Sequence, residues 1–93
     1  MIPEKQIERR LVSWLRARAI EVVKMALQHD AGWPDLQILL PGGRTLWMEL
    51  KRNGGVVSPL QRSKMDWLHR DGRDVVVCYS FEEAIDQVTR RLQ

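Results

Sequence analysis

Two acidic residues and a lysine have the types and spacing of a site for a divalent cation. Asp35 directly follows Pro34, while Glu49 and Lys51 stand two positions apart at the end of an apolar run. Hard cations such as Mg²⁺ and Mn²⁺ prefer oxygen ligands, and a cation held by carboxylates lowers the pKa of a bound water. These three residues therefore predict a site for a hard divalent cation and an activated water.

A hairpin of two predicted strands would bring these residues together. Residues 35–40 and 45–52 have strand patterns, and the connection at residues 41–44 has the sequence Pro-Gly-Gly-Arg, which is typical of a turn. The first acid opens one strand and the second acid lies near the end of the other. Pairing of the two strands therefore places both acids and the lysine at one end of a sheet.

Alternation of side chains divides the second predicted strand into two faces. Glu49 and Lys51 share a face with Trp47, and the opposite face is apolar: Leu46, Met48 and Leu50. A simpler interpretation stays open, in which Asp35 caps a turn and the two charges of the second strand form an ordinary exposed face. Against it, an acid with apolar neighbours is costly unless it is bound or paired.

Four short motifs in this order resemble a known family. Pro34-Asp35 followed by Glu49-Leu50-Lys51 resembles the PD-(D/E)XK nuclease superfamily. Three further motifs resemble its VRR-NUC family: Gly-x-Pro-Asp at residues 32–35, Glu-Arg-Arg-Leu-Val at residues 8–12 and Ser-Pro-Leu-Gln at residues 58–61. The resemblance runs from about residue 4 to residue 85, and it is most similar to small stand-alone members that resemble Holliday-junction resolvases.

The resemblance implies a fold, a reaction and a set of site residues. The implied fold is an α/β restriction-endonuclease-like core of order αβββαβα, with a four-stranded mixed sheet flanked by helices. The implied metal ligands for Mg²⁺ or Mn²⁺ are Asp35, Glu49, the backbone carbonyl of Leu50 and, through a water, Glu8. The implied catalytic residues are Glu8, Asp35, Glu49, Lys51 and Gln61. The implied partners are branched or junction DNA and a second copy in a homodimer.

Two of these residues have competing explanations in their local sequence. Glu8 lies beside the apolar stripe of a helix predicted over residues 4–18, where it is either an active-site acid or a solvated surface acid. Gln61 stands at the third position of a helix predicted over residues 58–71, and Ser58 is its N-cap. The pattern Ser-x-x-Gln is a capping box, so local structure alone could explain this glutamine.

The remaining elements complete the predicted order. Residues 21–28 are assigned to a strand, although their composition also allows a helix, and residues 74–79 form a continuous apolar run that indicates an interior strand covered on both faces. The helix over residues 58–71 is expected to turn three residues inward: Leu60, Trp67 and Leu68. A capping box at Ser80 and Glu83 opens the last helix.

Several residues near these elements have an open role. Trp33 either stacks on a base or covers the core or a dimer contact. His29 binds substrate, shuttles a proton or does neither, and Lys64 either contacts phosphate or is solvated. Cys78 is expected to be a packed core residue. Arg90 and Arg91 suit the C-terminal end of the last helix better than a contact with DNA.

Composition limits the class of protein. The chain of 93 residues, with 44% hydrophobic residues, suits one domain over residues 1–93, and so small a domain gains from a partner surface. The net charge of +3 permits nucleic-acid binding. One cysteine, no apolar run of membrane length and a polar N-terminus indicate a reducing, cytoplasmic location without a membrane.

The leading hypothesis is therefore a metal-dependent DNA endonuclease that acts through water, is selective for four-way junctions and works as a homodimer. One alternative is a catalytically silent module that binds nucleic acid or supports an assembly. Another is a nuclease with the same chemistry that acts on flaps or other DNA substrates. Metal-dependent cleavage that is lost in Asp35→Asn would separate the enzyme from the silent module.

Overall fold

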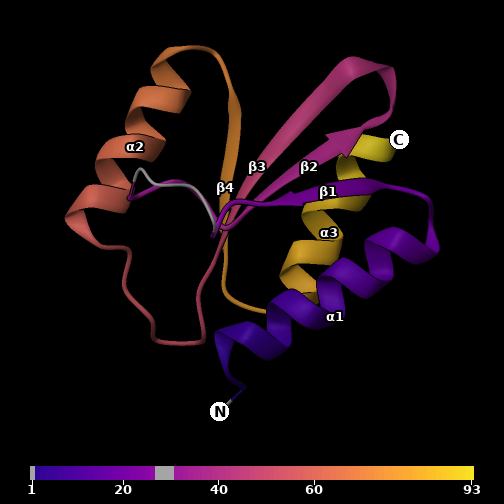
Figure 1. Ribbon diagram of the computed structural model, residues 1–93, viewed down its shortest axis with the longest axis horizontal. Helices are drawn as coiled ribbons and strands as arrows, with labels where there is room; N and C mark the ends of the chain where they lie inside the picture. The colour runs from indigo at the N-terminus through magenta and orange to yellow at the C-terminus, as the bar shows by residue number, and fades with distance from the viewer. Residues whose placement is uncertain (1, 27–30) are drawn as a thin grey trace.

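One mixed sheet of four strands lies between two layers of helix (Figure 1). The structure is a computed structural model and describes residues 2–26 and 31–93. The elements follow in the order α1 (Glu4–Ala17), β1 (Glu21–Lys24), β2 (Leu36–Leu40), a 3₁₀ turn (Pro41–Gly43), β3 (Arg44–Leu50), α2 (Pro59–Arg70), β4 (Asp74–Cys78) and α3 (Phe81–Leu92). The predicted order αβββαβα is confirmed.

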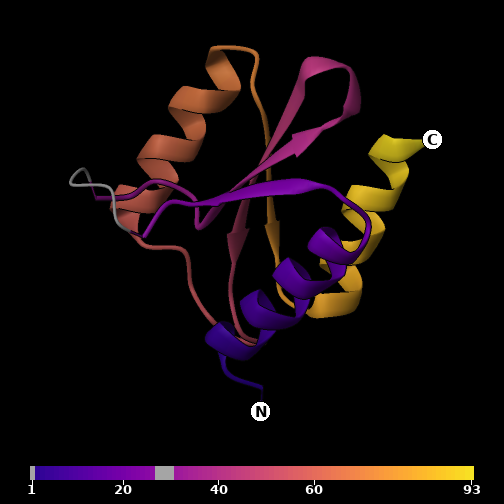
Figure 2. The same cartoon turned by 45° about the vertical axis from the view of Figure 1, so that its right-hand side comes forward.

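The sheet keeps its strands in sequence order, β1-β2-β3-β4. The first three strands are antiparallel neighbours, and β4 runs parallel to β3. The parallel pair needs a crossover, which α2 provides. Figure 2 shows α1 and α3 together on one face of the sheet and α2 on the other.

The alternation predicted for β3 separates two hydrophobic clusters. Leu46, Met48 and Leu50 are buried in the larger cluster, which they share with the apolar stripes of α1 and α3. Trp47 points to the other face and packs against the smaller cluster beneath α2, which consists of Met65, Leu68 and Val75. The face that the sequence assigned to Glu49 and Lys51 is therefore the face covered by α2.

Helix α1 matches its predicted range to within one residue. Its buried stripe is formed by Ile7, Leu11, Val12 and Leu15. The helix ends where Ala19 adopts φ 59°, and the N–H of Ile20 reaches back to the carbonyl of Leu15. A left-handed residue after the last turn is a common helix terminus.

Helix α2 begins at the predicted cap but turns a different face inward. Ser58 and Gln61 form the capping box in both directions. The prediction that Leu60 and Trp67 point inward is wrong, because 55% and 50% of these side chains are exposed. The stripe that faces the sheet is instead Gln61, Met65 and Leu68, which follow the helical spacing i, i+4, i+7.

Both outer strands differ from their predictions. β1 ends at Lys24, and the N–H of Met25 then bonds to the carbonyl of Asp35 at 2.9 Å. Residues 27 and 28 of the predicted strand, and His29 after it, lie outside the described residues. β4 lies at the edge of the sheet, so its assignment as an interior strand is wrong. Helices do cover both of its faces, because Val75 belongs to one cluster and Cys78 to the other. A continuous apolar run therefore indicates that both faces of a strand are covered, but it does not indicate whether the strand has a neighbouring strand on each side.

The cap of α3 also differs in one contact. The Ser80 hydroxyl accepts a hydrogen bond from the Glu83 N–H at 3.0 Å, as predicted. The Glu83 carboxylate bonds to the N–H of Tyr79 at 3.1 Å and so reaches one residue earlier than a capping box requires.

Among the described residues, no helix is both long enough and apolar enough to cross a bilayer.

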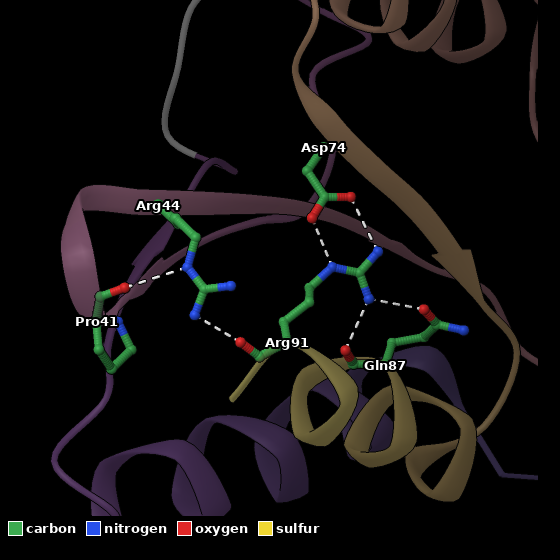
Figure 3. Close-up of polar contacts among 5 residues, drawn as sticks. All are labelled: Pro41, Arg44, Asp74, Gln87 and Arg91. Atoms are coloured by element: carbon green, nitrogen blue, oxygen red, sulfur yellow. Dashed lines mark hydrogen bonds and ion pairs between the residues drawn. The ribbon is translucent and has the colours of Figure 1, made fainter. Parts of the chain in front are cut away.

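A cluster of polar contacts fixes the end of the sheet that is remote from the predicted acids (Figure 3). The Arg91 guanidinium forms two hydrogen bonds with the Asp74 carboxylate and two more with the carbonyl and side-chain oxygens of Gln87. Arg44 donates to the carbonyls of Pro41 and Arg91. These contacts tie the last turn of α3 to the start of β4 and to the turn between β2 and β3.

Candidate active site

The predicted acids meet where β2 begins and β3 ends. In the antiparallel register Leu36 pairs with Met48, so Asp35 lies next to Glu49. The Leu50 N–H donates a hydrogen bond of 2.7 Å to Asp35 Oδ2, which fixes this carboxylate against the end of β3. Pro34 is fully buried before Asp35 and holds the entry to β2. The hairpin prediction is confirmed in this respect.

Asp35 borders a pocket that also contains Glu8. The pocket is lined by Glu4, Lys5, Glu8, Ala26, Asp35 and Leu50. Burial raises the pKa of Asp35, the hydrogen bond from Leu50 lowers it, and the negative charge of Glu8 raises it. Glu8 therefore lies within electrostatic reach of Asp35, although its carboxylate is paired with Lys24 at 3.9 Å.

Glu49 is a buried acid with unequal oxygens. Its side chain is 1% exposed, and Oε2 accepts from Gln61 Nε2 at 3.0 Å and pairs with Lys51 Nζ at 3.2 Å. Oε1 is buried and has no hydrogen-bond partner among the described residues. Burial and the charge of Asp35 raise the pKa of Glu49 to about 7, and contact with Lys51 opposes the rise.

Lys51 is placed by an extension of the parallel strand pair. Its N–H bonds to the carbonyl of Cys78 at 3.0 Å, one residue beyond the end of β3. Its side chain therefore continues the face of Glu49, where it is buried. A buried ammonium beside a buried carboxylate is the arrangement that the spacing Glu-x-Lys predicts.

Gln61 forms the predicted cap and also contacts Glu49, through opposite ends of one amide; its catalytic role stays a prediction. Its Oε1 accepts the Ser58 N–H at 2.9 Å, and its own N–H donates to the Ser58 hydroxyl at 3.1 Å, which completes the cap. Its Nε2 donates to Glu49 as described above. The two explanations that the sequence left open are therefore compatible, because a glutamine side chain has an acceptor and a donor.

The donor set suits an oxygen-binding cation. A buried carboxylate oxygen without a partner is costly, and Glu49 Oε1 lies beside a second carboxylate that is also desolvated. The backbone carbonyl of Leu50 is a further oxygen at this position. The described residues contain no group of three acidic, histidine or cysteine side chains that could hold a metal ion, so the participation of Glu8 stays a prediction.

Two residues that the sequence left open lie next to this site. Trp33 stacks on Trp47 with ring centroids 5.3 Å apart and packs with it against the cluster beneath α2. This position agrees with the interpretation of Trp33 as a cover of the core. Lys64, for which the sequence left a phosphate contact and a solvated position open, has its ammonium 4.3 Å from the centroid of the Trp33 ring. The spacing of three residues after Gln61 indicated the side of α2 on which Lys64 lies, but not its contact with Trp33.

A mixed α/β sheet of this order, with two carboxylates and a lysine at the junction of β2 and β3, defines the nuclease-like PD-(D/E)XK class of fold. The family model of the VRR-NUC domain matches residues 2–82. The chain belongs to the VRR-NUC family, which is a family of nuclease domains.

Comparison with solved structures supports the same fold. A structure described as a VRR_NUC domain superposes with a TM-score of 0.81 at 23% identity, covering 97% of each chain. A second, described as a VRR_NUC domain protein, gives a TM-score of 0.79 at 20% identity over 99% of this chain and 91% of the other. None of the curated proteins compared with the sequence matches it.

Proposed function

We propose that this protein is a metal-dependent DNA endonuclease that hydrolyses phosphodiester bonds with water. The observation that carries the proposal is the unpartnered, buried Oε1 of Glu49 next to the carboxylate of Asp35. Mg²⁺ or Mn²⁺, held by these two acids and the Leu50 carbonyl, would supply a Lewis acid for the phosphate and would lower the pKa of the attacking water. Glu8 is proposed to join this ligand set through a water.

The chain's own residues divide the remaining tasks. Lys51 orients the attacking water or offsets negative charge that develops on the phosphate. Gln61 and Lys51 both donate to Oε2 of Glu49, so that the other oxygen stays directed away from them and available as a ligand. None of the five proposed residues is a covalent nucleophile of this reaction, and water is the attacking group.

The proposed substrate is branched DNA, and the proposed active form is a homodimer. The mildly basic chain, with a net charge of +3, is compatible with a polyanionic substrate. Two copies would present two sites to two strands, which suits paired cuts in a four-way junction. Flaps and other DNA structures are the alternative substrates for the same chemistry.

A cleavage assay tests the proposal. Labelled four-way junction, flap, duplex and single-stranded DNA are incubated with Mg²⁺, Mn²⁺ or EDTA and with the wild type, Asp35→Asn or Glu49→Gln. The asparagine can still accept the Leu50 N–H, so Asp35→Asn keeps this contact and removes the charge. Each variant is expected to lose cleavage by about 100-fold or more. Asp86→Asn is the control, since it makes the same change at an exposed pair with Arg90.

The outcomes separate the candidates. Junction cutting that needs metal and disappears in both variants supports a junction resolvase. Metal-dependent cutting of a different substrate keeps the chemistry and rejects the resolvase. Binding of DNA without cleavage of any substrate, unchanged by metal and by Asp35→Asn, would reject the enzyme in favour of a silent binding module.

A further inference from the structure

Three side chains form a stack directly beside the acids. The Trp33 and Trp47 rings lie 5.3 Å apart with an angle of 23° between their planes. The Lys64 ammonium lies 4.3 Å from the centroid of the Trp33 ring, within range of a cation–π contact. The stack joins three separate segments, because Trp33 precedes β2, Trp47 belongs to β3 and Lys64 belongs to α2.

Each residue of the stack lies two or three positions in sequence from a residue of the site. Trp33 stands two residues before Asp35, and Trp47 stands two residues before Glu49 on the same strand face. Lys64 stands three residues after Gln61, on the same side of α2. The contacts within the stack therefore fix the same three backbone segments that carry the three site residues.

The first turn of α2 has no buried core residue of its own, and the nearest core contact is that of Val57, directly before the Ser58 cap, with the smaller cluster. The buried residues of α2 are Met65 and Leu68, which lie in its middle and at its end. Leu60, in the first turn, is 55% exposed. The hydrogen bond from Gln61 to Glu49 nevertheless comes from this turn.

Close backbone contact reinforces the stack. Gly32 has φ +91°, and a Cβ at this position would lie 2.9 Å from the Leu60 carbonyl oxygen and 3.0 Å from Leu60 Cγ. Neither a side chain nor an ordinary backbone conformation fits there. The segment before Asp35 therefore lies directly against the first turn of α2.

We infer that Trp33 and Lys64 are positioning residues that align Gln61 and Asp35 with Glu49. They act through the backbone segments and do not contact the reacting atoms. Trp33 is therefore assigned to the geometry of the site and not to base stacking. The consequence for cleavage rests on the proposed function, whereas the consequence for the contact between Gln61 and Glu49 does not.

The test compares Trp33→Leu with a matched control on the other face of the sheet. Trp14 packs against the larger cluster and has Arg18 3.9 Å from its ring centroid, so Trp14→Leu removes the same kind of contact away from the acids. Lys64→Met removes the charge over Trp33, and Lys64→Arg restores a cation. Three quantities are measured for each variant: the thermal midpoint, the Mn²⁺ dissociation constant and the NMR shift of the Gln61 side-chain amide.

Both tryptophan variants are expected to lower the thermal midpoint. Of the two, Trp33→Leu should shift the Gln61 amide resonance and weaken Mn²⁺ binding by about tenfold or more, as loss of a supporting contact does at metal sites. Trp14→Leu should change neither quantity. Lys64→Met should act in the same direction and Lys64→Arg should return toward the wild type. Turnover should fall in parallel, with kcat affected more than KM.

An unchanged Gln61 resonance in Trp33→Leu, with Mn²⁺ affinity equal to that of the wild type, would overturn the inference. Equal effects of Trp14→Leu would overturn it too, because they would show a general response to destabilisation. If Trp33→Leu does not fold, the two Lys64 variants decide in the same way. A wild type that cuts no DNA would reject the proposed nuclease, yet the amide resonance would still report whether the stack positions Gln61.

Discussion

Glu49 combines a satisfied and an unsatisfied oxygen in one buried carboxylate. Oε2 has two donors, Lys51 and Gln61, and Oε1 has none in the described part of the chain. Such a group is unfavourable in isolation, since burial penalises its charged form. This unfavourable burial of Glu49 occurs at a position where catalysis or ligand binding would use the carboxylate.

The raised pKa of Glu49 makes the stability of the metal-free protein depend on pH. Its pKa rises from 4.5 to about 7 on folding, so the folded protein binds this proton more tightly than the unfolded chain. The resulting stabilisation is complete below pH 4.5 and is lost as the pH rises through 7, by roughly 3 kcal/mol at most. Glu49→Gln cannot titrate, so it should reduce this decline. Urea unfolding in EDTA at several pH values between 4.5 and 8 measures the difference.

The pKa of Asp35 is also raised, so some decline should remain in Glu49→Gln. A variant that loses as much stability as the wild type across this pH range would contradict the assignment of the proton to Glu49. Asp86→Asn provides the comparison, because Asp86 is exposed and its pair with Arg90 lies on the surface.

Individual site residues could be predicted from sequence where a local rule applies. Strand alternation and pairing of the two strands were sufficient to place Asp35, Glu49 and Lys51 at one end of the sheet, whereas their roles stay predictions. The contact of Lys64 with Trp33 could not be predicted in this way, because it joins segments that only the tertiary fold brings together. The lack of a partner for Glu49 Oε1 in the described part of the chain could not be predicted either, because it depends on where donor groups of other residues lie in the folded protein.

Helix α2 is the element in which structure and site are coupled. The amide of Gln61 closes the N-terminal cap with its oxygen and contacts Glu49 with its nitrogen. A change at this residue therefore affects the helix, the site or both, according to which end of the amide it alters. The two effects can be separated by choosing variants for each end.

Gln61→Glu should keep the cap and damage the site. A glutamate oxygen can still accept the Ser58 N–H, but the second oxygen would face Glu49 and repel it. Cleavage should fall by about tenfold or more while the helical circular-dichroism signal stays unchanged. Ser58→Ala should do the reverse and lower the free energy of unfolding by about 1 kcal/mol with a smaller effect on rate. An equal loss of rate in both variants would contradict this separation.

The inward face of α2 shows the limit of helical pattern reading. Leu60 and Trp67 lie seven residues apart, and Gln61 and Leu68 share the same spacing one position later. Apolarity favoured the first pair, but the tertiary contact of Gln61 with Glu49 turns the second pair toward the sheet. A polar residue turns inward when it has a partner on another element, as Gln61 has in Glu49 of β3. The sequence of one helix does not contain this information.

A second prediction about the elements concerns Arg91, whose contacts lie at the end of the sheet remote from the acids. Arg91→Met would leave the Asp74 carboxylate and the side-chain oxygen of Gln87 without this donor (Figure 3). We expect a decrease of about 1 kcal/mol in the free energy of unfolding, because Asp74 is partly exposed and water can replace the donor. Cleavage should stay within about twofold of the wild type.

Chemical denaturation and the junction assay measure the two quantities. Arg90→Met is the matched control, since its pair with Asp86 lies on the adjacent, more exposed position of α3. A large loss of cleavage in Arg91→Met with little loss of stability would show that this end of the molecule takes part in substrate binding.

At the scale of the whole molecule, the fold order was predicted correctly, whereas the interior position predicted for residues 74–79 was wrong, because β4 is an edge strand. Element order follows from periodicity along the chain, whereas an edge position is a property of the assembled sheet. The described part measures 34 × 33 × 23 Å and has a radius of gyration of 12.5 Å.

The proposed homodimer makes a prediction at this scale. Sedimentation at tens of micromolar protein should give a mass near twice 10.9 kDa. DNA binding by the inactive Asp35→Asn should weaken as salt rises, because phosphate contacts release counterions. A complex that contains one protein copy of 10.9 kDa per junction would contradict the dimer and leave single incisions as the mode of action.

The burial of Cys78 has a practical consequence for such experiments. The chain contains one cysteine, and its thiol is inaccessible, with a pKa that burial raises to about 12. Maleimide dyes react with exposed thiolates, so they should leave Cys78 unlabelled in the folded protein. A cysteine introduced at an exposed position such as Ser13 could then carry a fluorophore without removal of the native residue. Fluorescence from that position would follow assembly and DNA binding in the wild-type core, and slow labelling of Cys78 would report its opening.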